Sequence, residues 1–183
     1  MSDRLEPPLD SERIYEGVIV RLRRSRYRRA DGTVVVREVI DHPGASVIVP
    51  VDDGRVLMVR QPREAVQERL LELPAGKLDR PGEDPLECAR RELAEEVGCE
   101  AATWRSLGGF YTSPAILTEF IHCFLATDLR ALDPAQRPHD PAGEDEQIEV
   151  VPWALDDLEA LIDHVRDAKS LIGLLRLARE LRV

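Results

Sequence analysis

Three glutamates in the segment Arg91-Glu92-Leu93-Ala94-Glu95-Glu96 have the spacing to act together. On an α-helix, Glu92, Glu95 and Glu96 occupy positions i, i+3 and i+4, so their carboxylates project from one face. Such charges repel by about 4 kcal/mol per pair at about 4 Å and an effective dielectric near ~20. Oxygen ligands suit Mg²⁺ or Mn²⁺, which are often shared with substrate phosphates. The spacing allows a divalent-metal site, for which Glu92 and Glu96 are the leading candidate ligands and Glu95 is the next.

The sequence around these glutamates predicts where their helix begins and ends. Asp84 is expected to cap the helix, with Pro85 at its first position. Gly98 is expected to end it. A buried stripe is predicted opposite the acidic face, made of Leu86, Leu93 and Val97. The alternative to a metal site is a solvated acidic face paired with Arg91, because charged side chains are usually exposed.

The whole segment resembles the signature of the Nudix hydrolases, which cleave nucleoside diphosphates linked to another moiety. The matching positions are Gly76, Glu83, Arg91, Glu92, Leu93, Glu95, Glu96 and Gly98. The segment departs from the family pattern by one inserted residue in the loop between Gly76 and Glu83, and by Cys99 in place of an aliphatic residue. Matching residues at family spacing favour the metal site over the solvated face.

The resemblance implies further roles in and around the metal site. Arg91 has Glu87 and Glu95 one turn away on either side and is expected to hold carboxylates in position. Glu83 is expected either to orient Arg91 or to bind a metal through water. The backbone carbonyl of Ala75 is implied as a further metal ligand.

The hydrolysis that this family performs requires an in-line water and a base. The resemblance implies a glutamate from a late loop as that base. Glu146 is the leading candidate and Glu144 the second. The alternative is that this acidic loop only keeps the surface soluble.

Other segments resemble the ADP-ribose pyrophosphatase branch of the family. They are His42-Pro43-Gly44-Ala45, Val59-Arg60-Gln61-Pro62-Arg63, Leu71–Gly76 and Ser113-Pro114. This resemblance implies that Arg63 grips a phosphate through its guanidinium fork, although a surface arginine at a strand end is the alternative. Glu72 is expected either to pair with a signature arginine or to reach the substrate. Glu119 is expected near the terminal ribose.

The branch implies Mg²⁺-dependent hydrolysis of ADP-ribose to AMP and ribose 5-phosphate, with Mn²⁺ as a substitute, in a homodimer. One alternative is the same chemistry on other nucleoside diphosphate sugars or NADH. Another is a nucleotide sensor without turnover, which the retention of Glu92, Glu95 and Glu96 disfavours.

Composition limits the partners and the compartment. The chain has 183 residues and a net charge of −10, which disfavours binding to nucleic acid or an anionic membrane. No run approaches about 18 apolar residues, so no membrane span is expected. Three unpatterned cysteines favour a reducing, cytoplasmic setting.

The order of the expected elements predicts an α+β fold, a Nudix-like α/β/α sandwich with a mixed sheet and an N-terminal antiparallel β-hairpin. Residues 1–41 are expected to form the tail and hairpin, with a role in dimerisation, and residues 42–183 the hydrolase domain. The hairpin strands are expected at 14–27 and 34–40. Further strands are expected at 45–51, 55–60, 69–73, 104–111, 120–127 and 148–152. Two late helices are expected at 155–166 and 170–181, after a loop at 131–146.

Overall fold

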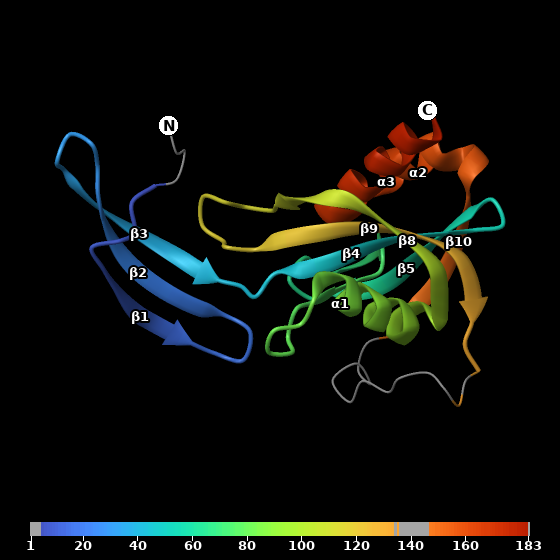
Figure 1. Ribbon diagram of the computed structural model, residues 1–183, viewed down its shortest axis with the longest axis horizontal. Helices are drawn as coiled ribbons and strands as arrows, with labels where there is room; N and C mark the ends of the chain where they lie inside the picture. The colour runs from blue at the N-terminus through green and yellow to red at the C-terminus, as the bar shows by residue number, and fades with distance from the viewer. Residues whose placement is uncertain (1–4, 134, 136–146, 183) are drawn as a thin grey trace. The chain divides into compact units, whose positions relative to one another are not determined.

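The computed structural model describes residues 5–133, 135 and 147–182. The chain divides into two compact units (Figure 1). One contains the chain up to Pro43 together with Tyr111–Phe120, and the other contains Gly44–Phe110 and the chain from Ile121 onward.

The first unit is a three-stranded antiparallel sheet in the order β1-β2-β3. Its strands are β1 (Asp10–Glu16), β2 (Arg21–Arg28) and β3 (Val34–Asp41). The hairpin expected here is formed by β2 and β3, whose register runs from Arg21 opposite Asp41 to Arg28 opposite Val34. Two backbone hydrogen bonds of Ile40 attach the segment Tyr111–Phe120 to β3. The Ile40 amide donates to the Ile116 carbonyl (2.8 Å), and the Ile40 carbonyl accepts from the Thr118 amide (3.1 Å).

The prediction of one continuous strand over residues 14–27 is wrong. The chain reverses at residues 17–20, where the Gly17 amide donates to the Val20 carbonyl at 2.8 Å, and β1 then pairs with β2. Val18 and Ile19 are β-branched, which suggested a strand, but both are exposed at the tip of this turn. Propensity cannot distinguish an apolar turn from an apolar strand when neither side chain is buried.

The second unit is built on a mixed sheet in the order β10-β5-β4-β9-β8, with β6 paired to β5 and β7 paired to β4. Its strands are β4 (Ala45–Asp52), β5 (Arg55–Arg63), β6 (Glu68–Glu72), β7 (Ala75–Lys77), β8 (Cys99–Tyr111), β9 (Phe120–Ala131) and β10 (Glu149–Ala154). The central pair β4 and β9 is parallel, whereas β4 is antiparallel to β5 and to β7. The β4–β5 hairpin closes at Asp53 and Gly54, which both have positive φ, as tight hairpin turns require.

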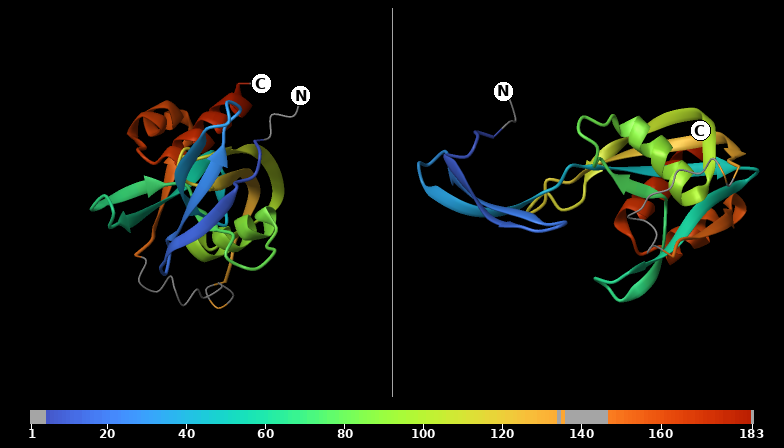
Figure 2. Two further views of the ribbon diagram at one scale, coloured as in Figure 1. Left: turned by 90° about the vertical axis from the view of Figure 1, so that its left-hand side faces the viewer. Right: turned by 90° about the horizontal axis from the view of Figure 1, so that it is seen from below.

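Helices cover both faces of this sheet (Figures 1 and 2). They are α1 (Pro85–Glu92), continued by the π-helical turn η1 (Leu93–Val97), the 3-10 turn η3 (Leu155–Asp157), α2 (Leu158–His164) and α3 (Ala168–Leu181). The helix expected at 155–166 is thus a 3-10 turn followed by a shorter α-helix. Across the described chain, no helix has the length and apolarity to cross a membrane.

Strand β4 is buried on both sides because it lies between the two helical layers. Val47 and Val49 belong to the core that contains the buried residues of α2 and α3. Ile48 points to the opposite face, into the core with Ala89 and Leu93 of the α1–η1 helix. This alternation along one strand produces the three-layer arrangement, and it confirms the predicted α+β sandwich with its mixed sheet.

Candidate active site

The helix that carries the glutamates begins where the sequence predicts. The Asp84 carboxylate accepts from the amides of Leu86 (2.9 Å) and Glu87 (3.4 Å), and Pro85 occupies the first turn. The helix is fixed on β4 because the Ser46 hydroxyl donates to the Pro85 carbonyl at 2.7 Å. Gly98 ends the helix in the left-handed region with φ 73°, a conformation that glycine adopts without strain.

The second half of this helix differs from the expected α-helix. Residues Leu93–Val97 form a π-helical turn, which changes the spacing of side chains at the point where Glu95 and Glu96 lie. Leu93 and Val97 are buried as predicted, whereas Leu86 is half-buried, and Cys88 and Ala89 complete the buried stripe. The glutamates therefore lie on a helix whose regular period is interrupted.

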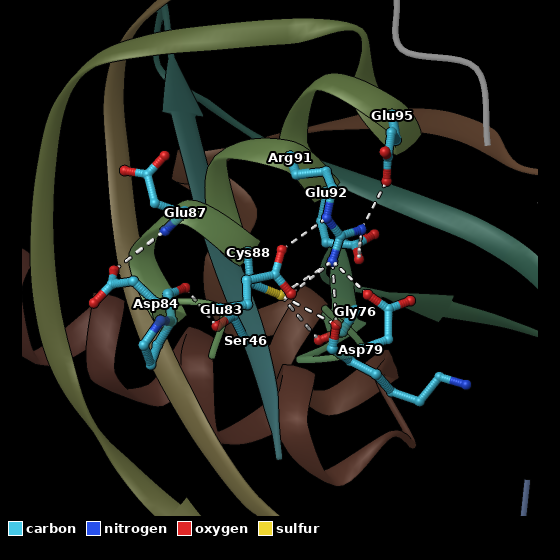
Figure 3. A network of polar contacts seen from close by, with 12 residues as sticks. Ser46, Gly76, Asp79, Glu83, Asp84, Glu87, Cys88, Arg91, Glu92 and Glu95 are labelled. Atoms are coloured by element: carbon cyan, nitrogen blue, oxygen red, sulfur yellow. Dashed lines mark hydrogen bonds and ion pairs between the residues drawn. The ribbon is translucent and has the colours of Figure 1, made fainter. Parts of the chain in front are cut away.

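Arg91 lies at the centre of a carboxylate cluster (Figure 3). Its guanidinium donates to Glu83 (3.0 Å), Glu92 (2.5 Å) and Glu95 (2.9 Å), and it lies 3.5 Å from Asp79. Burial alone would lower the pKa of Arg91, but the bonds to Glu83, Glu92 and Glu95 outweigh this and raise it. Arg91 is thus a fixed cation that holds acidic side chains from both the helix and the preceding loop.

Two details of this cluster correct the sequence-based expectations. Glu87 does not pair with Arg91; it accepts instead from Arg90, at 2.6 Å, on the exposed side of the helix. The acidic face is also not an exposed surface, since Glu92 is 9% exposed. Burial raises the pKa of Glu92 to about 7, with the neighbouring carboxylates of Glu95 and Asp79 adding to the effect and Arg91 opposing it.

Strand β7 brings the backbone of Ala75 and Gly76 against the same glutamates. The Glu96 carboxylate accepts from the Ala75 amide at 3.0 Å. A Cβ placed on Gly76 would lie 1.8 Å from a carboxylate oxygen of Glu92, so this position has room only for glycine. Glu92 and Glu96 therefore both contact the short strand whose Ala75 carbonyl was predicted as a metal ligand.

The donor chemistry of this region fits a hard divalent cation. Glu92 and Glu96 offer carboxylate oxygens and Ala75 a carbonyl, which are ligands that Mg²⁺ prefers. Glu95 is held by Arg91. Within the residues that the structure describes, no three acidic, histidine or cysteine side chains converge as a metal cage. The fit therefore rests on two carboxylates and a backbone oxygen, an arrangement that suits an ion completed by water and substrate.

The predicted phosphate ligand Arg63 and the predicted substrate residue Glu72 contact one another. The guanidinium of Arg63 forks onto both Glu72 oxygens at 2.7 Å each. Lys169, at the start of α3, donates to the same carboxylate at 2.5 Å. Burial acts to raise the pKa of Glu72, but the two cations outweigh it and hold that pKa below its usual value. Glu72 thus pairs with Arg63 and Lys169 rather than with a signature arginine.

Lys169 and its neighbours were missed by the sequence reasoning. Asp167 caps α3 by accepting from the Ser170 amide (3.0 Å) and also accepts from Lys169 (2.9 Å). The Ser170 hydroxyl accepts from the Leu73 amide at 2.6 Å. The segment Asp167–Ser170 is typical of a helix start. No local pattern indicated that Lys169 and Ser170 would each contact a residue 97 positions away along the chain.

The remaining predicted site residues lie elsewhere. Glu119 belongs to the first unit, where it accepts from the Thr112 hydroxyl (2.6 Å) and lies 3.5 Å from His42. Glu146 and Glu144 lie outside the described residues. On the second unit, an open hollow of about 840 Å³ lies beside the Arg91 cluster and is lined in part by Arg80, Glu83 and Glu95.

Comparison with known proteins finds relatives that match most of this chain. The chain is 44% identical over 135 residues to an ADP-ribose pyrophosphatase of Mycobacterium tuberculosis, a match that covers 73% of this chain and 65% of that protein. It is 36% identical over 168 residues to an ADP-ribose pyrophosphatase of Bacillus subtilis, covering 90% of this chain and 88% of that one.

A solved structure described as an ADP compounds hydrolase has the same fold, with a TM-score of 0.82 at 23% identity over 99% of this chain and 97% of its own. Residues 41–173 match the NUDIX domain, and they include the helix, the glutamates and strand β7. The chain therefore belongs to the NUDIX domain family.

Proposed function

We propose that this protein hydrolyses the pyrophosphate bond of ADP-ribose to AMP and ribose 5-phosphate, with Mg²⁺ as its cofactor and Mn²⁺ as a substitute. The relatives that carry the name ADP-ribose pyrophosphatase support this substrate, because they match this chain at 36% and 44% identity.

The observation that carries the proposal is the charge imbalance around Arg91. Four carboxylates, from Asp79, Glu83, Glu92 and Glu95, surround this single guanidinium. The side chains of Glu83, Glu92 and Glu95 are at most 11% exposed, and buried negative charge that is not fully compensated is costly. A bound divalent cation would offset most of this excess, which supports a metal site on this acidic helix.

The proposed roles follow from the contacts. Glu92 and Glu96, with the Ala75 carbonyl, would hold the metal ion, and Glu95 would help to bind it while paired to Arg91. When bound, the metal neutralises phosphate charge and lowers the pKa of a coordinated water. Arg91 keeps the acidic side chains oriented, because its fork contacts the loop and the helix at once.

We assign substrate contacts to Arg63, Glu72 and Glu119. Arg63 would grip a phosphate, because a guanidinium presents two parallel donors. Glu72 holds that guanidinium through both of its oxygens and would release it when the phosphate binds. Glu119 would contact the terminal ribose.

We assign the role of general base to Glu146, with Glu144 as the second candidate. A base abstracts a proton in the chemical step, so Glu146→Gln should lower kcat more than it raises KM. An unchanged kcat would move the role to another residue, and the same measurement on Glu144→Gln would then decide whether it is the base.

The proposed biological unit is a homodimer in the cytoplasm that binds neither nucleic acid nor membrane. The net charge of −10 disfavours binding to nucleic acid or to an anionic membrane. Exposed apolar side chains of the N-terminal unit support its association with a second copy; they include Ile14 and Val36 on the sheet and Val18 and Ile19 in the turn between β1 and β2. The three free cysteines support a reducing compartment.

Chromatographic separation of products tests the proposed reaction. Purified protein is incubated with ADP-ribose, ADP-glucose, GDP-mannose and NADH in separate reactions, each with Mg²⁺ and with EDTA. We expect AMP and ribose 5-phosphate from ADP-ribose, in a reaction that EDTA stops. Faster turnover of another compound would keep the chemistry and replace the substrate. Binding of ADP-ribose without products from any compound would favour a nucleotide sensor.

A further inference from the structure

The carboxylate of Glu72 has two cationic partners that differ in their access to solvent. The side chain of Glu72 is 2% exposed, that of Lys169 is 16% exposed and that of Arg63 is 37% exposed. Arg63 also lines an open hollow of about 460 Å³ on the β5–β6 hairpin. Of the two cations, Arg63 is therefore the one placed to meet an incoming ligand, while Lys169 stays beneath it.

The cluster is balanced in charge when all four of its members are present. Glu72 and Asp167 supply two negative charges, and Arg63 and Lys169 supply two positive charges. If Arg63 turned from Glu72 to a phosphate while no second cation was present, a buried carboxylate would lose its only partner. Breaking a buried ion pair in this way is strongly unfavourable.

Lys169 is fixed in position independently of Arg63. It is the second residue of α3, and its ammonium group also contacts Asp167, the capping residue of that helix, at 2.9 Å. The next residue, Ser170, bonds to the Leu73 amide at 2.6 Å. The start of α3 is therefore attached directly to the residue that follows Glu72, which keeps Lys169 beside the carboxylate whatever Arg63 does.

We propose that Lys169 is a positioning residue for substrate capture: it remains as the counter-ion of Glu72 when Arg63 transfers its guanidinium fork to a phosphate of the substrate. Lys169 does not touch the substrate in this arrangement. It lowers the free energy required to release Arg63, so its effect falls on substrate binding. This inference rests on the proposed function, because it takes Arg63 as the phosphate ligand.

Steady-state kinetics of Lys169→Met on ADP-ribose with Mg²⁺ tests the role in capture. We expect KM to rise about tenfold while kcat changes little, because binding and not the chemical step depends on the release of Arg63. Lys169→Arg should recover most of the loss, since it keeps the charge. Arg166→Met is the matched control: it removes a cation that pairs with Glu68 on the same β6 strand, but at an exposed position, and should leave KM unchanged. An unchanged KM in Lys169→Met would overturn the proposal.

A double-mutant cycle in unfolding by urea tests the counter-ion role without any substrate. Arg63→Met and Lys169→Met are measured singly and together. We expect the double variant to lose more stability than the sum of the single losses, because only then does Glu72 have neither cation. If the losses of stability in the two single variants add up to the loss in the double variant, the proposal is overturned. This holds even if Lys169→Met raises KM, because Lys169 would then act on the substrate directly.

The two measurements separate this inference from the proposed function. If the wild-type protein does not hydrolyse ADP-ribose, the proposed function fails, and the urea cycle still decides whether Lys169 and Arg63 share Glu72. If the wild-type protein is active and either measurement contradicts its expectation, only the role of Lys169 fails.

Discussion

The Arg91 cluster and the Glu72 cluster are built from the same kind of ion pair but differ in net charge. In the first, one arginine faces four carboxylates. In the second, one nearly inaccessible carboxylate lies between an arginine and a lysine, and Asp167 completes a neutral set. The contrast shows how a protein prepares for different ligands. An excess of negative charge favours the binding of a cation, whereas a second cation beside a buried carboxylate lets the first one leave without that carboxylate being left alone.

Removing a predicted metal ligand should have the largest effect on activity. We expect Glu96→Gln to reduce turnover roughly 100- to 1000-fold, because the loss of one preorganised electrostatic group at a reaction centre has this magnitude. Circular dichroism should show an unchanged fold. Glu87→Gln on the same helix is the matched control, since Glu87 pairs with Arg90 on the exposed side and should keep nearly full activity. Wild-type activity in Glu96→Gln would contradict the metal assignment.

Removing the central cation should destabilise the metal-free protein. Arg91→Met leaves four carboxylates without their shared partner, and we expect the free energy of unfolding to fall by about 3 kcal/mol at neutral pH, as for other broken buried ion pairs. Added Mg²⁺ should recover part of this loss by binding the native state. Arg90→Met, which breaks an exposed pair with Glu87, should change stability by less than about 1 kcal/mol. Equal losses of unfolding free energy in Arg91→Met and Arg90→Met would show that Arg91 does not offset repulsion among the four carboxylates.

Placing a methyl group on β7 should weaken metal binding more than it weakens the fold. The Cβ introduced by Gly76→Ala would overlap the Glu92 carboxylate, which must move away. We expect the concentration of Mg²⁺ needed for half-maximal activity to rise about tenfold, the lower end of the range for misplaced ligands. Lys77→Ala on the same strand removes only an exposed side chain and serves as the control. The same Mg²⁺ requirement in both variants would mean that Glu92 does not bind the metal.

The balanced cluster should produce the smallest effect, a dependence of stability on acid. The folded state lowers the pKa of Glu72 below its ordinary value of 4.5. Its ionised form therefore stabilises the fold fully above about pH 4.5, and this contribution is lost as pH falls further through the folded pKa. In urea unfolding, the advantage of wild type over Glu72→Gln should shrink below this pH. A constant difference between wild type and Glu72→Gln across this pH range would refute the paired state.

Much of the architecture and the ends of the helix that carries the glutamates could be predicted because they depend on near neighbours. Asp84, Pro85 and Gly98 define the helix through bonds within a few residues, and the turn at Asp53-Gly54 defines the β4–β5 hairpin in the same way. Errors arose where local preference and burial disagree. The apolar residues Val18 and Ile19 form a turn instead of a strand, and Glu87 faces solvent although its spacing placed it next to Arg91.

The sequence by itself determined the family, the helix that carries the glutamates and the chemistry that those glutamates favour, because the spacing of charges on one helix and its caps are local properties. Only the tertiary structure decided that Glu92 is buried against Gly76, and that Arg63 and Lys169 share Glu72. The Lys169–Glu72 contact joins α3 to β6, and α3 packs so closely on the sheet that a Cβ on Gly173 would lie 2.5 Å from the Leu73 side chain. Which cation reaches a buried carboxylate depends on how the helix and the sheet pack, and no spacing along the chain encodes that distance.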